Sequence, residues 1–441
     1  MTLARHLAAA RVPRYTSYPT AADFTSAVGP EQAARWLGEI ESDEPISVYL
    51  HVPYCRDICH YCGCHAKAAR RESVVDAFRT ALLAEIALVA RHAKAPVRIG
   101  RIAWGGGTPS ILGLGGLASI LSRLRESFDM RLLAEHAIEL DPRTVDPGLA
   151  VGLAALGVTR ASLGVQDLDP QVQEAIGRFQ PQPQVRRAVD ALRAAGIGRL
   201  NFDLVYGLPH QTEASLRRTL DAVVDLAPSR IAFYGYAHLP ARRANQRLID
   251  EEALPGPQAR LRQAALIGDT LETAGFERIG IDHFARPDDP LAVAARQGRL
   301  RRNFQGYTDD PHDVLIGFGP SAISKLPGGF AQNASDIGHW RAEVTAGKLA
   351  TRRGHGFTGD DRIRARLIES LMCIFLTELG EADLRIADEL ALLRPFVMEG
   401  LIELERGQLR LTENGRPFVR LVAAAFDRFR TEADQTFSEA V

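Results

Sequence analysis

The stretch ISVYLHVPYCRDICHYCGCH at residues 46–65 joins a predicted β-strand to four closely spaced cysteines. Cys55, Cys59, Cys62 and Cys64 follow the pattern C-x3-C-x2-C-x-C. Cysteine thiolates at such spacing on one loop are typical ligands of an iron–sulfur cluster. Three of them can reach three irons of a 4Fe–4S cube, which leaves the fourth iron open to a substrate. The pattern therefore predicts a 4Fe–4S site directly after the first strand.

Two other uses of these cysteines remain compatible with the spacing. Zinc also takes four Cys or His ligands, and His51, His60 and His65 lie nearby in the sequence. Zinc sites, however, usually pair two separated groups of ligands. A redox-active C-x-x-C disulfide would account for only two of the four cysteines. The fifth cysteine, Cys373, lies in the apolar run LMCIFL and is expected to be a core thiol.

Outward from this stretch, short apolar strands alternate with amphipathic helices. Such alternation predicts parallel strands with helices packed on their outer face. Six units predict an α/β fold in which a (β/α)6 barrel closes at least in part, with functional groups at the carboxyl ends of its strands. The predicted strands are 46–52, 101–107, 136–141, 160–166, 199–207 and 230–238, and the clearest helices are 73–92, 114–128, 184–195 and 213–226.

Polar residues alternate with aliphatic ones along these strands. Tyr49 lies between Val48 and Leu50, and Glu139, Gln166 and Asp203 alternate with aliphatic neighbours in the same way. A helix-covered barrel buries its aliphatic face against the helices, so the polar set is expected to point into the lumen. A polar lumen predicts a bound ligand rather than a lumen filled by packing alone.

The rhythm of strand and helix fails after about residue 285, and the chain turns helical again from Asp360. The stretch GLIELERGQLRLTENG at 400–415 predicts a hairpin of a winged-helix-like unit. We therefore predict three parts: an N-terminal arm at 1–40, a barrel domain at 41–330, and a smaller, mostly α-helical C-terminal domain at 355–441.

Charge and composition restrict the class of protein. The chain of 441 residues has 53 Lys and Arg against 54 Asp and Glu, so no basic surface for nucleic acid is indicated. No apolar run is long enough to cross a membrane, and the N-terminus lacks the apolar core of a signal peptide. Clustered cysteines kept reduced as metal ligands predict a cytoplasmic enzyme.

The cysteine motif, with Tyr61 directly before Cys62, resembles that of the radical S-adenosylmethionine (SAM) superfamily. GGGTP at 105–109, directly after the second strand, is similar to the methionine-binding segment of that superfamily. Further segments resemble the family of oxygen-independent coproporphyrinogen III oxidases, and together they cover most of the chain. They include PRYTSYPTA (13–21), YLHVPYC (49–55), CGCH (62–65), NFDLVYGLP (201–209), DHFARPDD (282–289) and RNFQGYT (302–308).

The resemblance implies a radical-SAM barrel that holds one 4Fe–4S cluster on Cys55, Cys59 and Cys62, together with two SAM molecules. Cys64 is implied to be a catalytic residue rather than a ligand, along with Tyr49 and Glu139. Carried over by motif, the residues implied to bind the SAM molecules are Tyr49, Tyr61, Gly106, Gly107, Thr108, Glu139, Gln166, Arg178, Asp203, Ala237 and Ile323.

The family reaction removes carbon dioxide from two propionates of coproporphyrinogen III and leaves the vinyl groups of protoporphyrinogen IX. The resemblance implies a flavodoxin- or ferredoxin-like electron donor, an unidentified electron acceptor and a monomeric enzyme. A tetracarboxylate substrate needs cationic or hydrogen-bonding partners, for which Arg14, Tyr15, Tyr18, His283 and Arg286 are candidates.

Two related functions stay open at the level of sequence. A heme-carrying chaperone shares the scaffold, but its relatives typically lack the cysteine at position 64 and the RYTSYPT arm, both of which are present here. A methyltransferase that modifies tetrapyrroles is the second alternative.

Overall fold

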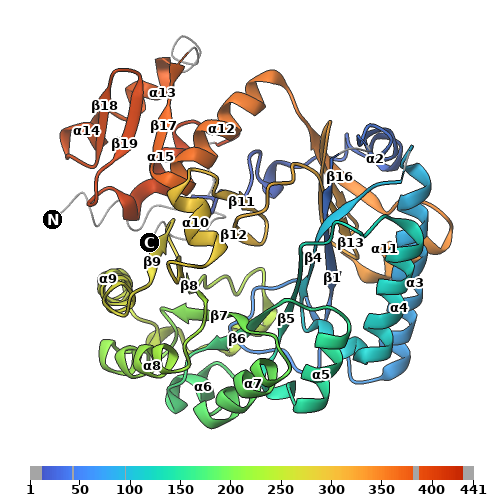
Figure 1. Cartoon of the computed structure of the whole chain (residues 1–441). Helices are drawn as coiled ribbons and strands as arrows, with labels where there is room; N and C mark the ends of the chain where they lie inside the picture. The colour runs from blue at the N-terminus through green and yellow to red at the C-terminus, as the bar shows by residue number, and fades with distance from the viewer. Residues whose placement is uncertain (1–11, 42–43, 95, 381–386, 431–441) are drawn as a thin grey trace.

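One open 12-stranded sheet organises the computed structural model, which describes residues 12–41, 44–94, 96–380 and 387–430 (Figure 1). The strands follow the order β16-β15-β14-β13-β1-β4-β5-β6-β7-β8-β10-β9. Its six central strands run parallel in sequence order. They are β1 (Ile46–Val52), β4 (Ile99–Gly106), β5 (Glu135–Leu140), β6 (Arg160–Gln166), β7 (Arg199–Tyr206) and β8 (Arg230–Gly235).

The predicted strands are thus present, with small differences at their ends. The strand expected at 101–107 begins earlier, at Ile99, and the strand expected at 230–238 ends at Gly235. Along β1, Val48 and Leu50 are at most 1% exposed and belong to the main hydrophobic core, as the alternation requires. Full burial of one such side chain contributes about 1.5–3 kcal/mol.

Helices cover the outer face of these strands (Figure 1). Local chemistry fixes several of their starts: Asp146 accepts a hydrogen bond from the Leu149 N–H at 2.7 Å, and Thr212 caps α8 through the Ser215 N–H at 3.1 Å. The helices are α3 (Glu72–His92), α4 (Gly113–Ser127), α5 (Pro147–Ala155), α6 (Pro170–Ala175), α7 (Gln182–Ala194), α8 (Glu213–Asp225) and α9 (Pro257–Thr273).

Beyond residue 285 the sheet continues where the sequence predicted only loops. β13 (Leu315–Phe318) pairs with β1 in parallel, and β14 (Ile323–Leu326), β15 (Gly329–Asn333) and β16 (Thr351–Gly356) follow antiparallel. At the other side β10 (His283–Ala285) and β9 (Glu277–Ile279) add to β8. The two edges do not pair, so the array stays an open, partial barrel.

The C-terminal part combines helices with a small sheet. Helix α12 (Gly359–Ile374) leads to the three-stranded sheet of β17 (Leu376–Glu378), β18 (Ile402–Glu405) and β19 (Gln408–Leu411), in which β18 and β19 form the predicted hairpin. Shorter helices complete it: α13 (Ala387–Leu392), α14 (Arg394–Met398) and α15 (Val419–Ala424). The domain boundaries proposed above stay a prediction.

The N-terminal arm connects this part to the sheet. Val12, Tyr15 and Tyr18 belong to the apolar core of the C-terminal part. Arg302, beside the sheet, donates to the Tyr15 carbonyl at 3.1 Å, and Arg420 of α15 donates to the Pro13 carbonyl at 3.0 Å. Later in the arm, α2 (Pro30–Leu37) packs against α3.

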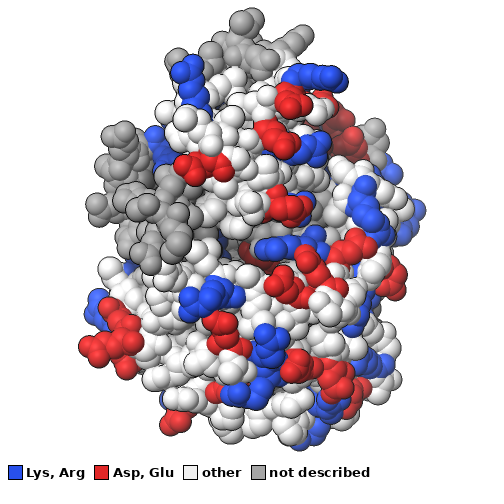
Figure 2. Space-filling model, turned by 90° about the vertical axis from the view of Figure 1, so that its left-hand side faces the viewer, with Lys and Arg blue, Asp and Glu red and all other residues white. Residues whose placement is uncertain are grey.

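Two further observations concern the helices and the surface. Within the described ranges, none of the helices combines the length and the apolar character needed to cross a bilayer. Side chains of both charges are interspersed over the face drawn in Figure 2.

The fifth cysteine lies in the core, as its apolar sequence neighbours predicted. Cys373 is buried in a small apolar cluster with Leu291 and Leu300.

Candidate functional site

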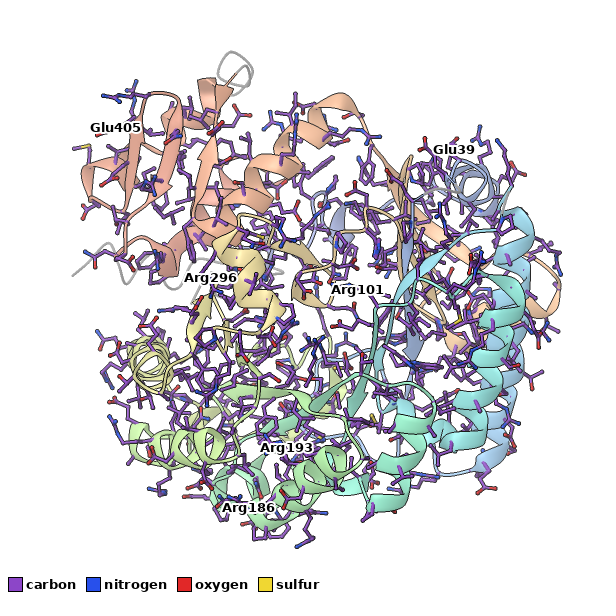
Figure 3. The ribbon with its side chains drawn as sticks, viewed as in Figure 1. Glu39, Arg101, Arg186, Arg193, Arg296 and Glu405 are labelled. Atoms are coloured by element: carbon purple, nitrogen blue, oxygen red, sulfur yellow. The ribbon has the colours of Figure 1, made fainter. Side chains whose placement is uncertain are left out.

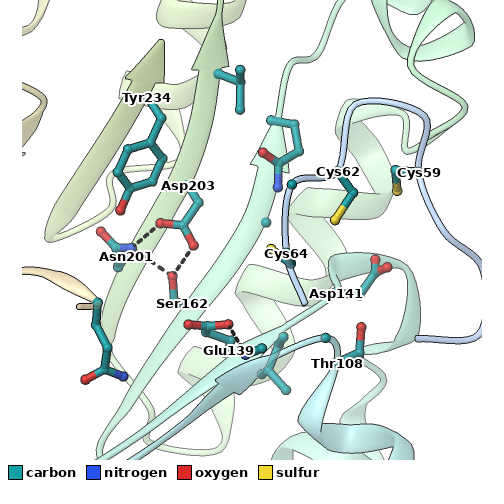
Figure 4. Close-up of a pocket in the computed structure, with 18 of the residues that line it drawn as sticks. Cys59, Cys62, Cys64, Thr108, Glu139, Asp141, Ser162, Asn201, Asp203 and Tyr234 are labelled. Carbon is teal, nitrogen blue, oxygen red and sulfur yellow. Dashed lines mark hydrogen bonds between the residues drawn. The ribbon is translucent and has the colours of Figure 1, made fainter. Parts of the chain in front are cut away.

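A cavity of about 940 Å³ fills the space inside the parallel strands and opens at their carboxyl ends. The cysteine loop that follows β1 forms one wall of its mouth, and polar side chains from β5, β6, β7 and β8 form its interior (Figure 4). Of the predicted site residues, the following line it: Cys55, Cys59, Tyr61, Cys62, Cys64, Gly106, Gly107, Thr108, Glu139, Gln166, Arg178, Asp203 and Ala237.

The thiols of the loop receive donors from neighbouring segments. Thr108 donates to the Cys55 sulfur at 3.5 Å, and Arg178 donates to the Cys59 sulfur at 3.4 Å. Arg178 is itself buried and forms an ion pair with Asp141 at 3.2 Å. A cationic and a hydroxyl donor aimed at sulfur suit thiolates, which are the form that binds metal.

The acidity of the loop thiols differs along the chain. Burial raises the pKa of Cys55 to about 11. A hydrogen bond from Cys64 lowers the pKa of Cys62 to about 6, and the same bond raises the pKa of Cys64. The Cys62 thiol thus ionises more readily than those of Cys55 and Cys64, and Cys64 serves as its donor.

The zinc alternative would use histidines near the cysteine loop as ligands. One ring nitrogen of each is already engaged: His51, His60 and His65 bond to backbone carbonyls at 3.0, 3.3 and 2.6 Å. These contacts favour a site formed by the cysteines alone.

The glycine segment after β4 passes directly beneath the cysteine loop. A Cβ on Gly107 would lie 2.4 Å from the Tyr54 carbonyl oxygen, and Gly106 has a φ of +107°, so side chains are excluded at both positions. The backbone amides of this segment already have acceptors within the protein. The N–H groups of Gly106, Gly107 and Thr108 bond to Glu139, Val52 and Tyr54 at 3.1, 2.8 and 2.8 Å.

The lumen is polar, as the strand alternation predicted. Asp203 on β7 accepts hydrogen bonds from Ser162 on β6 at 2.6 Å and from Asn201 at 2.9 Å (Figure 4). Burial, followed by the charge of Asp203, raises the pKa of Glu139 to about 7, and burial also raises the pKa of Asp203. Two buried carboxyl groups in this environment therefore keep their protons to a higher pH than exposed ones do.

Two predicted residues do not line the cavity. The Tyr49 hydroxyl lies behind it, next to the Glu139 carboxyl group, and bonds to His51 Nδ1 at 3.2 Å. Ile323 is on β14, two strands away from β1.

The residues predicted to bind the substrate carboxylates lie in three different places. Arg14 and His283 line the main cavity, whereas Tyr15 and Tyr18 line a second cavity of about 460 Å³. Arg286 lies over the ring of Phe276 at 4.0 Å and donates to the Ala274 carbonyl, so it is turned away from both cavities. The sequence did not indicate these separations because they depend on how the arm crosses the sheet.

The segment after β8 contributes residues that the sequence did not single out. Arg242 and Arg243 line the mouth of the cavity. Asn245 and Gln246, in the 3-10 turn Ala244–Leu248, donate to backbone carbonyls of the cysteine loop. Only their position shortly after the strand predicted at 230–238 could have indicated them, because functional groups gather at the carboxyl ends of barrel strands.

Charged residues close the opposite end of the lumen. Arg101, Arg160 and Arg230 begin or nearly begin β4, β6 and β8, and Arg101 is seen inside the array in Figure 3. They alternate with three carboxylates in a closed ring, here called the floor ring. Its ion pairs are Arg101–Glu135 (3.6 Å), Glu135–Arg160 (3.0 Å), Arg160–Asp289 (3.7 Å), Asp289–Arg230 (2.6 Å), Arg230–Asp309 (3.0 Å) and Asp309–Arg101 (2.8 Å).

Comparison with known proteins identifies relatives along the whole chain. Residues 49–223 match the model of the radical SAM superfamily. The oxygen-independent coproporphyrinogen III oxidase of Bradyrhizobium diazoefficiens is 45% identical over 98% of this chain and 97% of its own length. The enzyme of the same name from Escherichia coli K12 is 38% identical over 95% and 93%. The solved structure of coproporphyrinogen III oxidase from Escherichia coli, described as a radical SAM enzyme, superposes with a TM-score of 0.90 at 35% identity, covering 96% of this chain and all of that one.

Proposed function

The chain belongs to the oxygen-independent coproporphyrinogen III oxidases, a family of radical SAM enzymes, and from this premise we propose how its own residues perform the reaction. It converts coproporphyrinogen III to protoporphyrinogen IX by oxidative decarboxylation of two propionates, in anaerobic heme biosynthesis. The relatives favour this reaction over the heme-carrying and methyltransferase alternatives. The observation that carries the proposal is the cysteine loop at the mouth of a polar lumen.

Cys55, Cys59 and Cys62 are the proposed ligands of the 4Fe–4S cluster. A cluster held by these three thiolates would supply the electron for reductive cleavage of SAM, and thus the radical that the family uses to take hydrogen from the substrate propionates. Arg178 and Thr108 support the thiolate form of two ligands through the bonds described above. The strand walls and the floor ring keep water from the reacting groups.

Two SAM molecules are proposed to share the lumen. A volume of about 940 Å³ lies near the upper end of the roughly 300–1,000 Å³ range of small-molecule cavities, which leaves room for more than one ligand. Gly106, Gly107, Thr108 and Glu139 are assigned to the first or to both, Gln166, Arg178, Asp203 and Ala237 complete the pair, and Tyr61 lines the same cavity. Tyr49 and Ile323, which do not line it, keep only the assignment that the family resemblance implies. Equilibrium dialysis with labelled SAM tests this, with two molecules bound per chain expected and one contradicting it.

Substrate carboxylates are proposed to bind at the mouth. Arg14 and Arg243 line the cavity there, and Arg14 is oriented by a hydrogen bond to the Gly235 carbonyl at 2.8 Å. Guanidinium groups bind carboxylates through paired hydrogen bonds. His283 lines the same cavity and bonds to Asp282 at 2.7 Å, which orients its ring toward the lumen side of β10.

An acidic flavodoxin- or ferredoxin-like protein is the proposed electron donor. Arg56 and Arg71 flank the cysteine loop, are exposed, and have no ion pair among the described residues. Complementary charge mainly accelerates association and makes it sensitive to salt. Replacing both with Glu is expected to slow cluster reduction by an acidic carrier at low salt, whereas reduction by dithionite stays unchanged. Arg406→Glu, in the β18–β19 hairpin, is the control; equal slowing there would contradict the proposed surface.

We further propose a cytoplasmic monomer. Reduced cysteine ligands suit the cytoplasm, and the monomeric state is the one that the family resemblance implies.

The decisive experiment is an anaerobic assay of purified protein reconstituted with iron and sulfide. Protoporphyrinogen formation from coproporphyrinogen is expected only when SAM and a reductant are both present. Tight heme binding without turnover would contradict the function. A colourless protein without acid-labile sulfide would contradict the cluster itself.

A further inference from the structure

We propose that Asn245 is a positioning residue that sets the reduction potential of the cluster by fixing two peptide groups of the cysteine loop. The inference rests on the proposed cluster site. It concerns the carboxamide of Asn245, whose Nδ2 lies 3.1, 3.0 and 2.9 Å from the carbonyl oxygens of Cys59, His60 and Cys62. The two N–H bonds of one amide group are therefore shared among three carbonyls of the loop.

These carbonyls determine where the neighbouring N–H groups point. In a trans peptide the C=O and the following N–H point in opposite directions. The N–H groups of His60, Tyr61 and Gly63 are therefore directed away from Asn245. The His60 N–H donates to the Ile176 carbonyl at 2.9 Å. Those of Tyr61 and Gly63 have no acceptor among the described residues, and both residues line the cavity at the proposed ligands.

Two N–H groups that face away from Asn245, in residues that line the cavity with the proposed ligands, would have a defined effect on a bound cluster. Hydrogen bonds to cluster sulfurs are among the factors that set its reduction potential. Such bonds would stabilise the reduced cluster, which carries the extra negative charge, and so raise the potential. Without Asn245 the peptide groups of His60 and Cys62 lose the bonds that orient them. The Tyr61 and Gly63 N–H groups would then be less available to a bound cluster.

Gln246 provides a matched control in the same turn. Its Nε2 donates to the Tyr61 carbonyl at 2.8 Å, so it also holds the cysteine loop. The N–H opposite that carbonyl belongs to Cys62 and already donates to the Cys59 carbonyl at 3.2 Å. Removing the Gln246 side chain therefore loosens the loop without releasing an N–H group that is free to reach a bound cluster.

The test is a potentiometric titration of the reconstituted protein without substrate, followed by electron paramagnetic resonance of the reduced cluster. Asn245→Ala is expected to lower the reduction potential of the cluster by about 59 mV. For a one-electron couple, this shift changes the ratio of reduced to oxidised cluster about tenfold when the potential of the solution is held constant. Gln246→Ala is expected to keep the wild-type potential. Asn245→Ala with full iron content and the wild-type potential would overturn the inference.

A second variant covers failure of the first. If Asn245→Ala takes up no cluster, Asn245→Ser, which keeps one donor, is measured in the same way and is expected to show a lowered potential. Loss of the cluster in both, with the cluster retained in Gln246→Ala, would overturn the inference because Asn245 would then act only in assembly. A wild-type protein that takes up no cluster would contradict the proposed function as well.

Discussion

At the carboxyl ends of the parallel strands, side-chain amides hold the backbone of the cysteine loop; at their amino ends, six charged side chains form the floor ring. Within the loop, Asn245 and Gln246 bond to backbone carbonyls and not to sulfur, so the thiols and two N–H groups remain for a ligand. On the floor each charge has at least two partners within the protein. The mouth is therefore built to receive a group, and the floor to close the lumen.

The electrostatics of the floor ring agree with a permanent closure. Burial by itself raises the pKa of Asp309, but its bonds with Arg101 and Arg230 outweigh this and hold the pKa well below its usual range. The ion pairs of the ring connect the first residues of β4, β5, β6 and β8 to the loop segments that contain Asp289 and Asp309. An open sheet whose edges never pair is thereby tied together at one end.

The largest effect is expected at the mouth, from Cys59→Ala. Loss of one thiolate removes a proposed cluster ligand, so turnover and the visible absorption of the cluster should both disappear. Because the floor ring is untouched, the far-ultraviolet circular dichroism should remain that of the wild type. Retention of a full cluster in this variant would show that Cys59 is not a ligand.

The next largest effect is expected at the floor, from Asp289→Asn. The Asp289 side chain is 2% exposed and pairs with both Arg160 and Arg230. Removing one partner of a buried charge network costs about 3–5 kcal/mol, because the remaining charges stay buried without compensation. Chemical unfolding at neutral pH measures the loss. An exposed pair, such as Arg70–Asp57 with side chains 79% and 67% exposed, is the control, and an equal loss from Arg70→Ala would contradict the comparison.

The two ends also differ in how far the sequence predicted them. The mouth was predictable because Cys55, Cys59 and Cys62 follow a local spacing, and Glu139 and Asp203 follow a period of two along their strands. The floor was not, because Asp289 and Asp309 lie in loops that look alike in sequence to solvent-exposed turns. Their pairing with Arg160 and Arg230 depends on how strands far apart in sequence are arranged.

The strands after residue 285 were missed for a related reason. β13, β14 and β15 are four or five residues long and are joined by glycine-rich turns, so no period could be recognised. Asn245 was missed because a single amide in a polar loop has no pattern at all. Its role follows only from three carbonyls brought to it by the fold.

A smaller effect is expected from the pH dependence of the lumen. The folded protein holds a proton on Glu139 up to about pH 7, whereas the unfolded chain releases it from about pH 4.5. Stability from this group is therefore complete below pH 4.5 and is lost as the pH rises to 7, with a slope of at most about 1.4 kcal/mol per pH unit. Glu139→Gln should flatten the dependence of the unfolding free energy of the cluster-free protein between pH 5 and 7.

Glu85 offers the matched control for this measurement. Burial raises its pKa to about 7 as well, but it lies outside the lumen and accepts bonds from Gly319, Asn333 and Trp340 at 2.7, 2.7 and 3.0 Å. Glu85→Gln should remove a similar slope and also lower stability at every pH, because an NH2 group replaces one of the two oxygens that accept those bonds. Parallel curves for Glu139→Gln and the wild type would contradict the raised pKa of Glu139.

The smallest effect is expected from Cys64→Ser, which is also the most specific test of the ligand set at the mouth. Cys64 borders the cavity and donates to Cys62, yet it is not among the proposed ligands. Serine keeps a donor but loses the polarisable thiol, so turnover should fall roughly tenfold, about 1.4 kcal/mol in barrier height. Iron and sulfide content should stay at the wild-type level. Loss of the cluster in this variant would show that Cys64 is a ligand. The iron and sulfide content therefore decides whether three or four thiols of the loop bind the cluster.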